Sequence, residues 1–298
     1  MEFTVQLTNK KEYIDSIIEK SIPNPQGYQK LIMEAMSYSL VAGGKRLRPM
    51  LMLETYHLFG GRDDERIVPF MAAMEMIHTY SLVHDDLPAM DNDDYRRGRK
   101  TTHVVYGHSM GILAGDALLN YAFETMSAGL MRLTGENLIR GVKALNTIAS
   151  KAGIFGMIGG QVVDVLSSDH TIEKERLDFI YELKTSALIE ASILAGAILA
   201  GADEEAQQDM NKVASCIGMA FQIQDDILDV TSTTKELGKP IHSDEKNNKT
   251  TYVTLLGIEG ARLKVEEYTN QGLTILDKYA SDSSFLYQLL EALVHRKN

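Results

Sequence analysis

Residues 204–230 read EEAQQDMNKVASCIGMAFQIQDDILDV, a stretch in which apolar side chains recur at the three-to-four-residue spacing of an α-helix. The 298-residue chain has six prolines, and none of them lies between Ala89 and Lys239. Proline interrupts helices because its ring fixes φ and because it has no backbone N–H. This half of the chain is therefore predicted to form one helix after another.

Helical spacing also describes much of the remaining sequence. Periodic segments occupy residues 12–20, 28–41, 50–59, 68–87, 114–130 and 177–200, and strand-like alternation of useful length is absent. Clusters of Gly, Pro, Asn and Asp separate the segments, but none is long enough to divide two domains. We expect one all-α domain over residues 1–298, a bundle of about ten or more helices. Residues 231–249 are expected to form its one long irregular loop.

Composition restricts the partners and the compartment. The net charge of −11 argues against a nucleic-acid surface, which needs a positive field. The N-terminus lacks the regions of a secretion signal, and the longest apolar run, residues 187–202, is shorter than the ~20 residues that span a bilayer. The single cysteine, Cys216, fits a reducing compartment. We therefore expect a cytoplasmic protein that binds no nucleic acid and has no membrane span.

An aspartate cluster interrupts the apolar part of the opening stretch. Asp225 and Asp229 are four residues apart and share a helix face, Asp226 stands beside them, and Gln222 lies one turn earlier. Carboxylates this close repel each other unless a cation lies between them. Oxygen ligands suit Mg²⁺, which proteins commonly share with substrate phosphates. A solvated carboxylate patch is the alternative for one cluster alone, but two such clusters in apolar helices favour a metal site.

The first cluster along the chain spans Asp85 to Asp91 and cannot lie on one face of an unbroken helix, because the spacing is six residues. Pro88 is expected to mark the end of that helix. His78 lies seven residues before Asp85 and so shares its face. The sequence then becomes basic at Arg96, Arg97 and Arg99. This order suits an anion that is bridged by metal on one side and bound by guanidinium groups on the other.

Two glycine-containing motifs complete the set. Gly43-Gly44-Lys45-Arg46-Leu47-Arg48-Pro49 places three cations beside a flexible turn, just before a helix expected to begin near Pro49. Glycine backbone and a helix N-terminus both favour phosphate binding, although a basic surface loop is the alternative for this motif alone. Gly159-Gly160-Gln161 with Asp164 is interpreted first as close helix packing and second as a contribution to a site.

These motifs, together with Lys184-Thr185 and Gln222, resemble the trans-prenyl (polyprenyl) diphosphate synthase family, most of all its bacterial farnesyl enzymes. They extend from residue 43 to about 252 in the family's order and spacing. The resemblance implies a helical bundle of isoprenoid-synthase type around a central cavity, and a homodimer. It also implies a Mg²⁺-dependent prenyltransferase of isoprenoid biosynthesis. Isopentenyl diphosphate would condense head to tail with dimethylallyl or geranyl diphosphate to give (2E,6E)-farnesyl diphosphate and diphosphate.

The resemblance also implies a role for each matched residue. The diphosphate of isopentenyl diphosphate would be held by Lys45, Arg48, His78 and Arg97. The allylic site would be formed by Arg96, Lys239, Lys184, Thr185 and Gln222, with a further phosphate contact from Lys249. About three Mg²⁺ ions would be bound by Asp85, Asp86, Asp91, Asp225 and Asp229. Catalysis would depend most on Lys184, Thr185, Gln222, Asp85 and Asp225.

Product length is assigned by resemblance to Tyr80, five residues before the first aspartate, with Ser81 beside it. At ~3.6 residues per turn Tyr80 lies about 140° from Asp85, so helical register alone does not predict that it faces the substrate chain. A longer-chain synthase, chiefly geranylgeranyl, is the alternative.

Two further hypotheses concern the chemistry itself. A class I terpene cyclase usually carries a second metal motif that ends in Glu, where this chain has Met219 after Asn211 and Ser215. A non-enzymatic regulatory subunit usually lacks one aspartate cluster, and both are present here. The sequence therefore favours the synthase over either of them.

Overall fold

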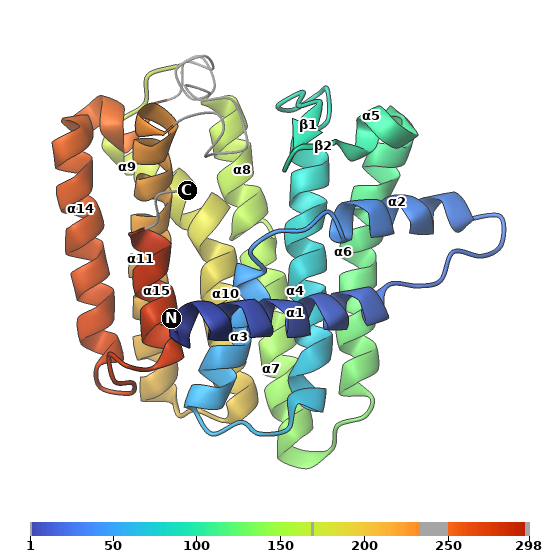
Figure 1. The fold of residues 1–298 in the computed structure, drawn as a ribbon, viewed down its shortest axis with the longest axis horizontal. Helices are drawn as coiled ribbons and strands as arrows, with labels where there is room; N and C mark the ends of the chain where they lie inside the picture. Colours follow the sequence, from blue (N-terminus) through green and yellow to red (C-terminus); the bar gives the residue numbers. More distant parts are fainter. Residues whose placement is uncertain (1, 168–169, 233–249, 296–298) are drawn as a thin grey trace.

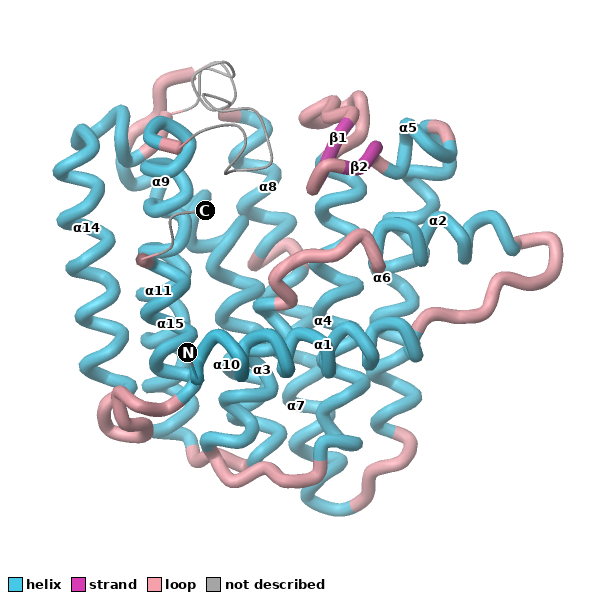
Figure 2. The backbone as a smooth tube through the Cα atoms, viewed as in Figure 1, coloured by secondary structure: helices cyan, strands magenta, loops and turns pink. Residues whose placement is uncertain are grey.

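The computed structural model describes residues 2–167, 170–232 and 250–295, and helices dominate them (Figures 1 and 2). The helices are α1 (Glu2–Ser21), α2 (Lys30–Leu40), α3 (Leu47–Leu58), α4 (Asp64–Asp85), α5 (Thr102–Tyr106), α6 (His108–Leu130), α7 (Gly135–Ala152), α8 (Met157–Leu166), α9 (Lys174–Ile180), the π-helical turn η1 (Tyr181–Ser186), α10 (Ala187–Ala200), α11 (Glu204–Thr231), α14 (Tyr252–Leu276) and α15 (Phe285–Val294). Two short strands, β1 (Tyr95–Arg96) and β2 (Arg99–Lys100), pair antiparallel. The prediction of an all-α bundle is confirmed.

Helix α10 lies inside the bundle, in contact with α3, α7 and α11, whereas α1 crosses the other helices (Figure 1). Apolar side chains surround α10 on all sides, as is typical of a buried helix. A Cβ atom at Gly196 would lie 2.3 Å from the carbonyl oxygen of Met52, so glycine is required for the close approach of α3. The core is thus closed around a helix whose single charged side chain, Glu190, is buried and paired with Lys151 of α7.

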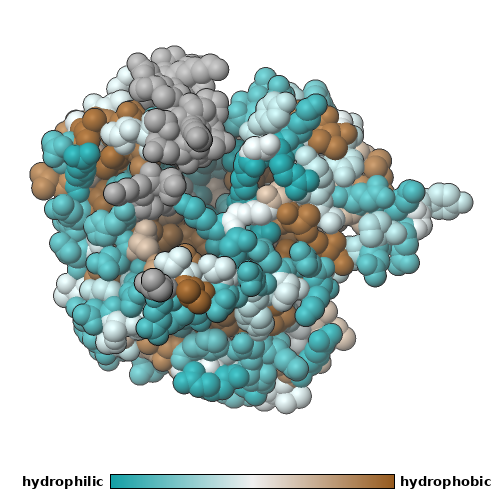
Figure 3. Space-filling view, in the orientation of Figure 1, coloured by the Kyte–Doolittle hydropathy of each residue, from teal (hydrophilic) through white to brown (hydrophobic). Residues whose placement is uncertain are grey.

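The continuous helical segment from Lys174 to Ala200 is long and apolar enough to cross a membrane by length and composition alone. However, 72% of its most apolar window is buried inside the bundle. On the face shown in Figure 3, apolar side chains form small groups among hydrophilic ones. The burial of this segment is what a core helix of the bundle requires.

The helix boundaries differ from the predicted ones in informative places. Helix α3 begins at Leu47 rather than near Pro49, after Arg46 in the left-handed region (φ 50°). The predicted helix at 177–200 is interrupted by η1, because a π-helical turn has no simple signature in apolar spacing. The predicted loop at 231–249 falls almost entirely outside the described residues. Helices α5, α7, α8, α14 and α15 fall outside the periodic segments named from the sequence, although α5, α7 and α8 lie in the proline-free stretch that was predicted to be helical.

Candidate active site

A cavity of about 980 Å³ lies between α4, α6, α8, η1 and α11. One part of its lining is polar and combines Arg48, His78, Asp85, Lys184, Thr185, Gln222 and Asp225. The rest is largely apolar and includes Tyr80, Leu119, Met157, Val162 and Phe221. Residues separated by up to 177 positions therefore meet around one space that suits a ligand with an ionic head and an apolar tail.

The first aspartate cluster is brought together by a turn. Helix α4 ends at Asp85, and the backbone N–H of Asp91 donates to the carbonyl oxygen of Asp85 at 2.9 Å. The chain thus folds back immediately after the helix, near Pro88. The six-residue spacing, which an intact helix could not place on one face, becomes a pair of adjacent residues.

The carboxylate of Asp85 is partly buried and lies near other carboxylates. Burial, together with the neighbouring Asp91 and Asp86 carboxylates, raises its pKa to about 6, although Lys184 and Arg96 act in the opposite direction. The amide of Gln161 on α8 donates to Asp85 Oδ1 at 2.8 Å. A divalent cation beside this group would favour its ionised form.

The hairpin β1–β2 directs its arginines to two different partners. Arg96 donates through Nε and Nη2 to Oδ1 of the buried Asp86, each at 2.6 Å. The loop residues Arg97 and Gly98 both have positive φ (53° and 74°), as in a type I′ turn. Arg97 instead donates through Nη1 to the carbonyl oxygen of Gly43. One hairpin thereby joins the first aspartate cluster to the basic loop.

The basic loop supplies one cation to the cavity. Arg48 lines it, and the buried Nε of Arg48 has no hydrogen-bond partner among the described residues. Burial lowers the Arg48 pKa to about 10, and Arg97 adds repulsion. Lys45 is exposed. Arg46, which the sequence placed in the same cationic set, turns inward.

The inward position of Arg46 corrects that grouping. Its Nε lies 2.7 Å from Asp15 Oδ1 and its Nη1 lies 2.7 Å from Glu75 Oε1, with Arg46 and Glu75 both almost fully buried. A guanidinium buried between two carboxylates holds the loop rather than a ligand.

His78 also lines the cavity, as its register with Asp85 predicted. Burial lowers its pKa well below the usual range, and the nearby Arg48 and Arg97 charges lower it further. The imidazole is therefore neutral at physiological pH. A neutral ring can donate one hydrogen bond without adding charge to an arginine-rich site.

The second aspartate cluster lies within α11, as predicted, but its members have different surroundings. Asp225 lines the cavity. Asp226 is buried and accepts from the Tyr181 hydroxyl at 2.7 Å and from the Tyr252 backbone N–H at 2.9 Å. Asp229 is 2% exposed and is not in the cavity lining. Among the described residues, no three His, Cys, Asp or Glu side chains meet at a single metal-binding point.

Lys184 and Thr185 both lie on η1, a π-helical turn of the kind often found at functional sites. Lys184 Nζ is 2.5 Å from Asp164 Oδ2, and the Thr185 hydroxyl donates to Gln222 Oε1 at 2.8 Å. The turn is packed closely against α8, because a Cβ atom at Gly160 would lie 2.3 Å from the backbone nitrogen of Lys184. The predicted packing role of this glycine is confirmed.

Helix α8 therefore contributes more than packing. Gln161 contacts Asp85, and Asp164 contacts Lys184, so α8 connects α4 to η1. Both residues belong to the motif Gly159-Gly160-Gln161 with Asp164, for which helix packing was the first prediction and a contribution to a site the second. Tyr181 and Tyr252 were missed entirely, because nothing in their spacing indicates that they converge on Asp226.

Tyr80 and Ser81 both line the cavity, although helical register did not predict this for Tyr80. Tyr80 is 5% exposed, and its hydroxyl is buried without a hydrogen-bond partner among the described residues. Burial and the nearby Asp85 charge raise its pKa to about 12, so the phenol is neutral. Lys239 and Lys249, two predicted phosphate ligands, lie outside the described residues.

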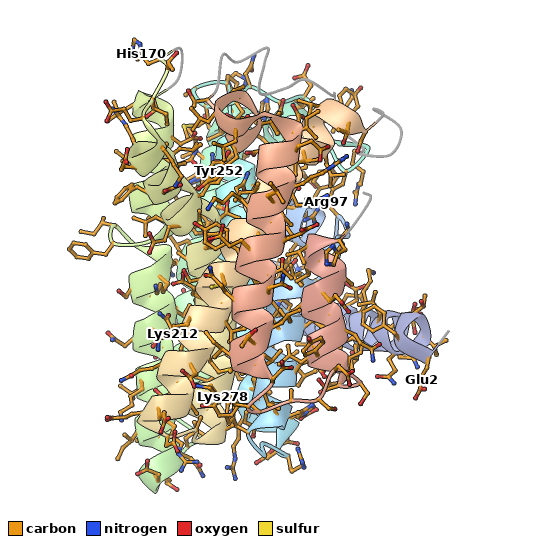
Figure 4. The ribbon with its side chains drawn as sticks, turned by 90° about the vertical axis from the view of Figure 1, so that its left-hand side faces the viewer. Glu2, Arg97, His170, Lys212, Tyr252 and Lys278 are labelled. Carbon is orange, nitrogen blue, oxygen red and sulfur yellow. The ribbon has the colours of Figure 1, made fainter. Side chains whose placement is uncertain are left out.

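The site lies toward one end of the bundle. In the side view of Figure 4, Arg97 and Tyr252 lie near the upper end, whereas Lys278 lies toward the opposite end. Tyr252 meets Asp226 of the second cluster, and Arg97 lies beside the first.

Comparisons with known proteins match nearly the whole chain. The model of the polyprenyl synthetase family matches residues 29–290. A geranylgeranyl diphosphate synthase from Cyanophora paradoxa is 42% identical, over 98% of this chain and 96% of that protein. A farnesyl diphosphate synthase from Geobacillus stearothermophilus is 39% identical, over 97% of this chain and 96% of that protein.

The fold is likewise similar to that of solved structures. One is a geranyltransferase from Helicobacter pylori complexed with magnesium and isoprenyl diphosphate. Its TM-score is 0.85 at 32% sequence identity, and the match covers 99% of this chain and 97% of that chain.

Proposed function

The chain belongs to the polyprenyl synthetase family, and from that premise we propose that it is a farnesyl diphosphate synthase. It would extend dimethylallyl and geranyl diphosphate with isopentenyl diphosphate. Prenyltransferase activity on isoprenoid diphosphates belongs to the family, whereas the product length depends on the cavity of the individual enzyme.

One observation carries the farnesyl assignment: Tyr80 lines the same cavity as Asp85 and Asp225. A buried aromatic ring one helical turn and a half before Asp85 occupies space into which a lengthening apolar chain would grow. The second candidate is a geranylgeranyl diphosphate synthase, because a relative of that name is 42% identical.

The carboxylates fit magnesium. Asp85, Asp86, Asp91, Asp225 and Asp229 offer oxygen donors. Burial and the neighbouring carboxylates raise the Asp85 pKa, and a divalent cation at this position would offset both effects. When bound, about three Mg²⁺ ions would supply positive charge to the diphosphate leaving group. The Asp86–Arg96 pair would share its charges with that diphosphate.

The remaining residues orient the two substrates. Arg48, with Lys45, Arg97 and the neutral His78, would hold the diphosphate of isopentenyl diphosphate, and the unpartnered Arg48 Nε offers it a buried donor. Asp164 offsets the Lys184 charge. The Gln222 oxygen, positioned by the Thr185 hydroxyl, would present a dipole to positive charge on the allylic carbon.

The reaction then needs no protein nucleophile. The allylic C–O bond breaks and its electron pair leaves with diphosphate, a step favoured by groups that bind the developing charge most strongly in the transition state. The double bond of isopentenyl diphosphate forms the new C–C bond. A proton then passes to the departed diphosphate, which restores a double bond and neutral charge on the product chain.

We also propose that residues 1–298 form one synthase domain and that two copies assemble as a homodimer. Apolar side chains are exposed along α8 and the turn before it, including Ile154 (70%), Phe155 (79%) and Leu166 (66%). A second copy would cover this face. A cytoplasmic location stays a prediction.

The test is a product analysis. The protein, labelled isopentenyl diphosphate, Mg²⁺ and either dimethylallyl or geranyl diphosphate are expected to give a C15 diphosphate as the main product. A C20 main product would replace the farnesyl assignment with the geranylgeranyl one. Cyclised hydrocarbon, or no elongation with either starter, would overturn the proposal.

A further inference from the structure

The side chain of His84 lies between the predicted length-determining residue and helix α6. Its ring meets the Tyr80 ring edge to face, with centroids 5.8 Å apart and an interplanar angle of 82°. Both rings line the cavity. Because the Tyr80 hydroxyl has no hydrogen-bond partner among the described residues, the contact with His84 is the directional interaction that orients the Tyr80 ring there.

His84 is itself attached to α6. Its Nε2 lies 3.0 Å from the carbonyl oxygen of Ile112, and a carbonyl can only accept, so Nε2 carries the proton. Asp116 Oδ1 lies 3.7 Å from the same nitrogen. A residue of α4 is thus hydrogen-bonded to the opposite wall of the cavity, where Ile112 is also a lining residue.

The contact depends on a glycine. A Cβ atom at Gly115 would lie 2.1 Å from His84 Nε2 and 2.2 Å from Cδ2, far inside van der Waals contact. Even alanine at this position would push the ring away from α6, on the side where Tyr80 lies. Gly115 is helical without a positive φ, so its lack of a side chain is needed for space and not for backbone conformation.

We propose that His84, seated against Gly115 and Ile112, is a positioning residue that clamps Tyr80 and thereby sets the depth of the product cavity. This inference rests on the proposed function, and it adds that the elongation stop combines Tyr80 and His84 of α4 with Ile112 and Gly115 of α6. Removing the clamp gives Tyr80 room to move aside and admits a longer chain. Adding a side chain at position 115 pushes the His84 and Tyr80 rings into the cavity and shortens the product.

The two directions can be separated by mutation. With dimethylallyl and isopentenyl diphosphates, His84→Ala is expected to raise the ratio of C20 to C15 product about tenfold, equivalent to the loss of one ordered aromatic contact. Gly115→Ala is expected to raise the ratio of C10 to C15 instead. In the double variant the Gly115 substitution should have no further effect, because the ring it displaces is absent.

Gly129→Ala is the control, since it also lies on α6 but its Cβ would meet Pro69, at 2.9 Å, rather than His84 or a residue that lines the cavity. It should leave the product ratio unchanged. Because His84→Ala only removes atoms, it remains informative even if crowding at position 115 prevents folding.

Tyr80→Ala separates failure of the clamp from failure of the proposed function. If Tyr80→Ala lengthens the product and His84→Ala does not, the clamp is wrong while the farnesyl assignment stands. If the wild type already stops at C20, the farnesyl assignment is wrong, and the clamp is then judged by whether His84→Ala extends the product beyond that length.

Discussion

The two aspartate clusters differ in how the chain builds them. The first is formed where α4 ends and a turn returns Asp91 to Asp85. The second lies inside the continuous helix α11, where Asp226 is held by Tyr181 and by the backbone of Tyr252. The difference shows that similar aspartate-rich sequences can be carried by a turn that brings Asp85, Asp86 and Asp91 together, or by a helix in which Asp226 is held by two hydrogen bonds. Crowding favours metal binding, and satisfied hydrogen bonds favour stability.

The largest expected effect concerns what the two clusters share. Asp85→Asn and Asp225→Asn should each lower kcat by about 10³-fold, because each removes a charge from the site that stabilises the leaving diphosphate. Steady-state kinetics at saturating Mg²⁺ measure this. Asn211→Ala, on the same helix as Asp225 but absent from the cavity lining, is the control and should leave kcat within a factor of about two. Full activity in either aspartate variant would show that the cluster it belongs to does not take part in the reaction.

The next effect is a difference between the clusters in how a substitution changes the free energy of unfolding. Burial raises the pKa of Asp85 from 3.8 to about 6, so stability is lost as pH rises from 3.8 through about 6, and the full cost remains at higher pH. At pH 8 without Mg²⁺, Asp85→Asn should therefore raise the free energy of unfolding by about 1–3 kcal/mol.

Asp226→Ala should lower it by about 1–3 kcal/mol, because this change removes Oδ2, the atom that accepts from both the Tyr181 hydroxyl and the Tyr252 backbone N–H. Urea denaturation followed by far-UV circular dichroism measures both variants. Shifts of the same sign would remove the distinction between a crowded cluster and a satisfied one.

A smaller effect tests the support of the first cluster. Gln161→Ala removes the amide that donates to Asp85, and it should raise the Mg²⁺ concentration for half-maximal activity about tenfold. Gln207→Ala, which removes a bond to the Ala202 carbonyl near the start of α11, should not change it. Equal Mg²⁺ requirements in all three proteins would show that Gln161 does not orient the ligand.

The smallest effect is the pH dependence of Mg²⁺ binding. Since Asp85 must ionise to bind the cation, the apparent affinity should fall as pH drops through about 6. The loss should be about twofold between pH 7 and pH 6 and should approach tenfold per unit below that. Titration of Mg²⁺ into the wild type and Asp85→Asn measures it, and a wild-type affinity that is flat between pH 7 and 5 would contradict the pKa.

The same contrast explains what the sequence could predict. The helix of Asp225 and Asp229 follows from local spacing, and so do the all-α class and the common face of His78 and Asp85. The return of Asp91 to Asp85 depends on a turn that Pro88 only suggests.

The positions of other residues are set by contacts between distant elements. The inward turn of Arg46 needs Asp15 and Glu75, and the seat of Asp226 needs Tyr181 and Tyr252. Such contacts leave no periodic trace in the sequence, and the same is true of the π-helical turn under Lys184.

Central to this account is that both clusters act on one diphosphate. The most direct test is calorimetric binding of a thio analogue of geranyl diphosphate that cannot ionise, with and without Mg²⁺, to the wild type, Asp85→Asn and Asp225→Asn. Tight binding should require Mg²⁺ and should weaken about 100-fold in each variant, the loss of a charged contact of about 2.7 kcal/mol. Wild-type affinity in either variant, or tight binding without Mg²⁺, would contradict it.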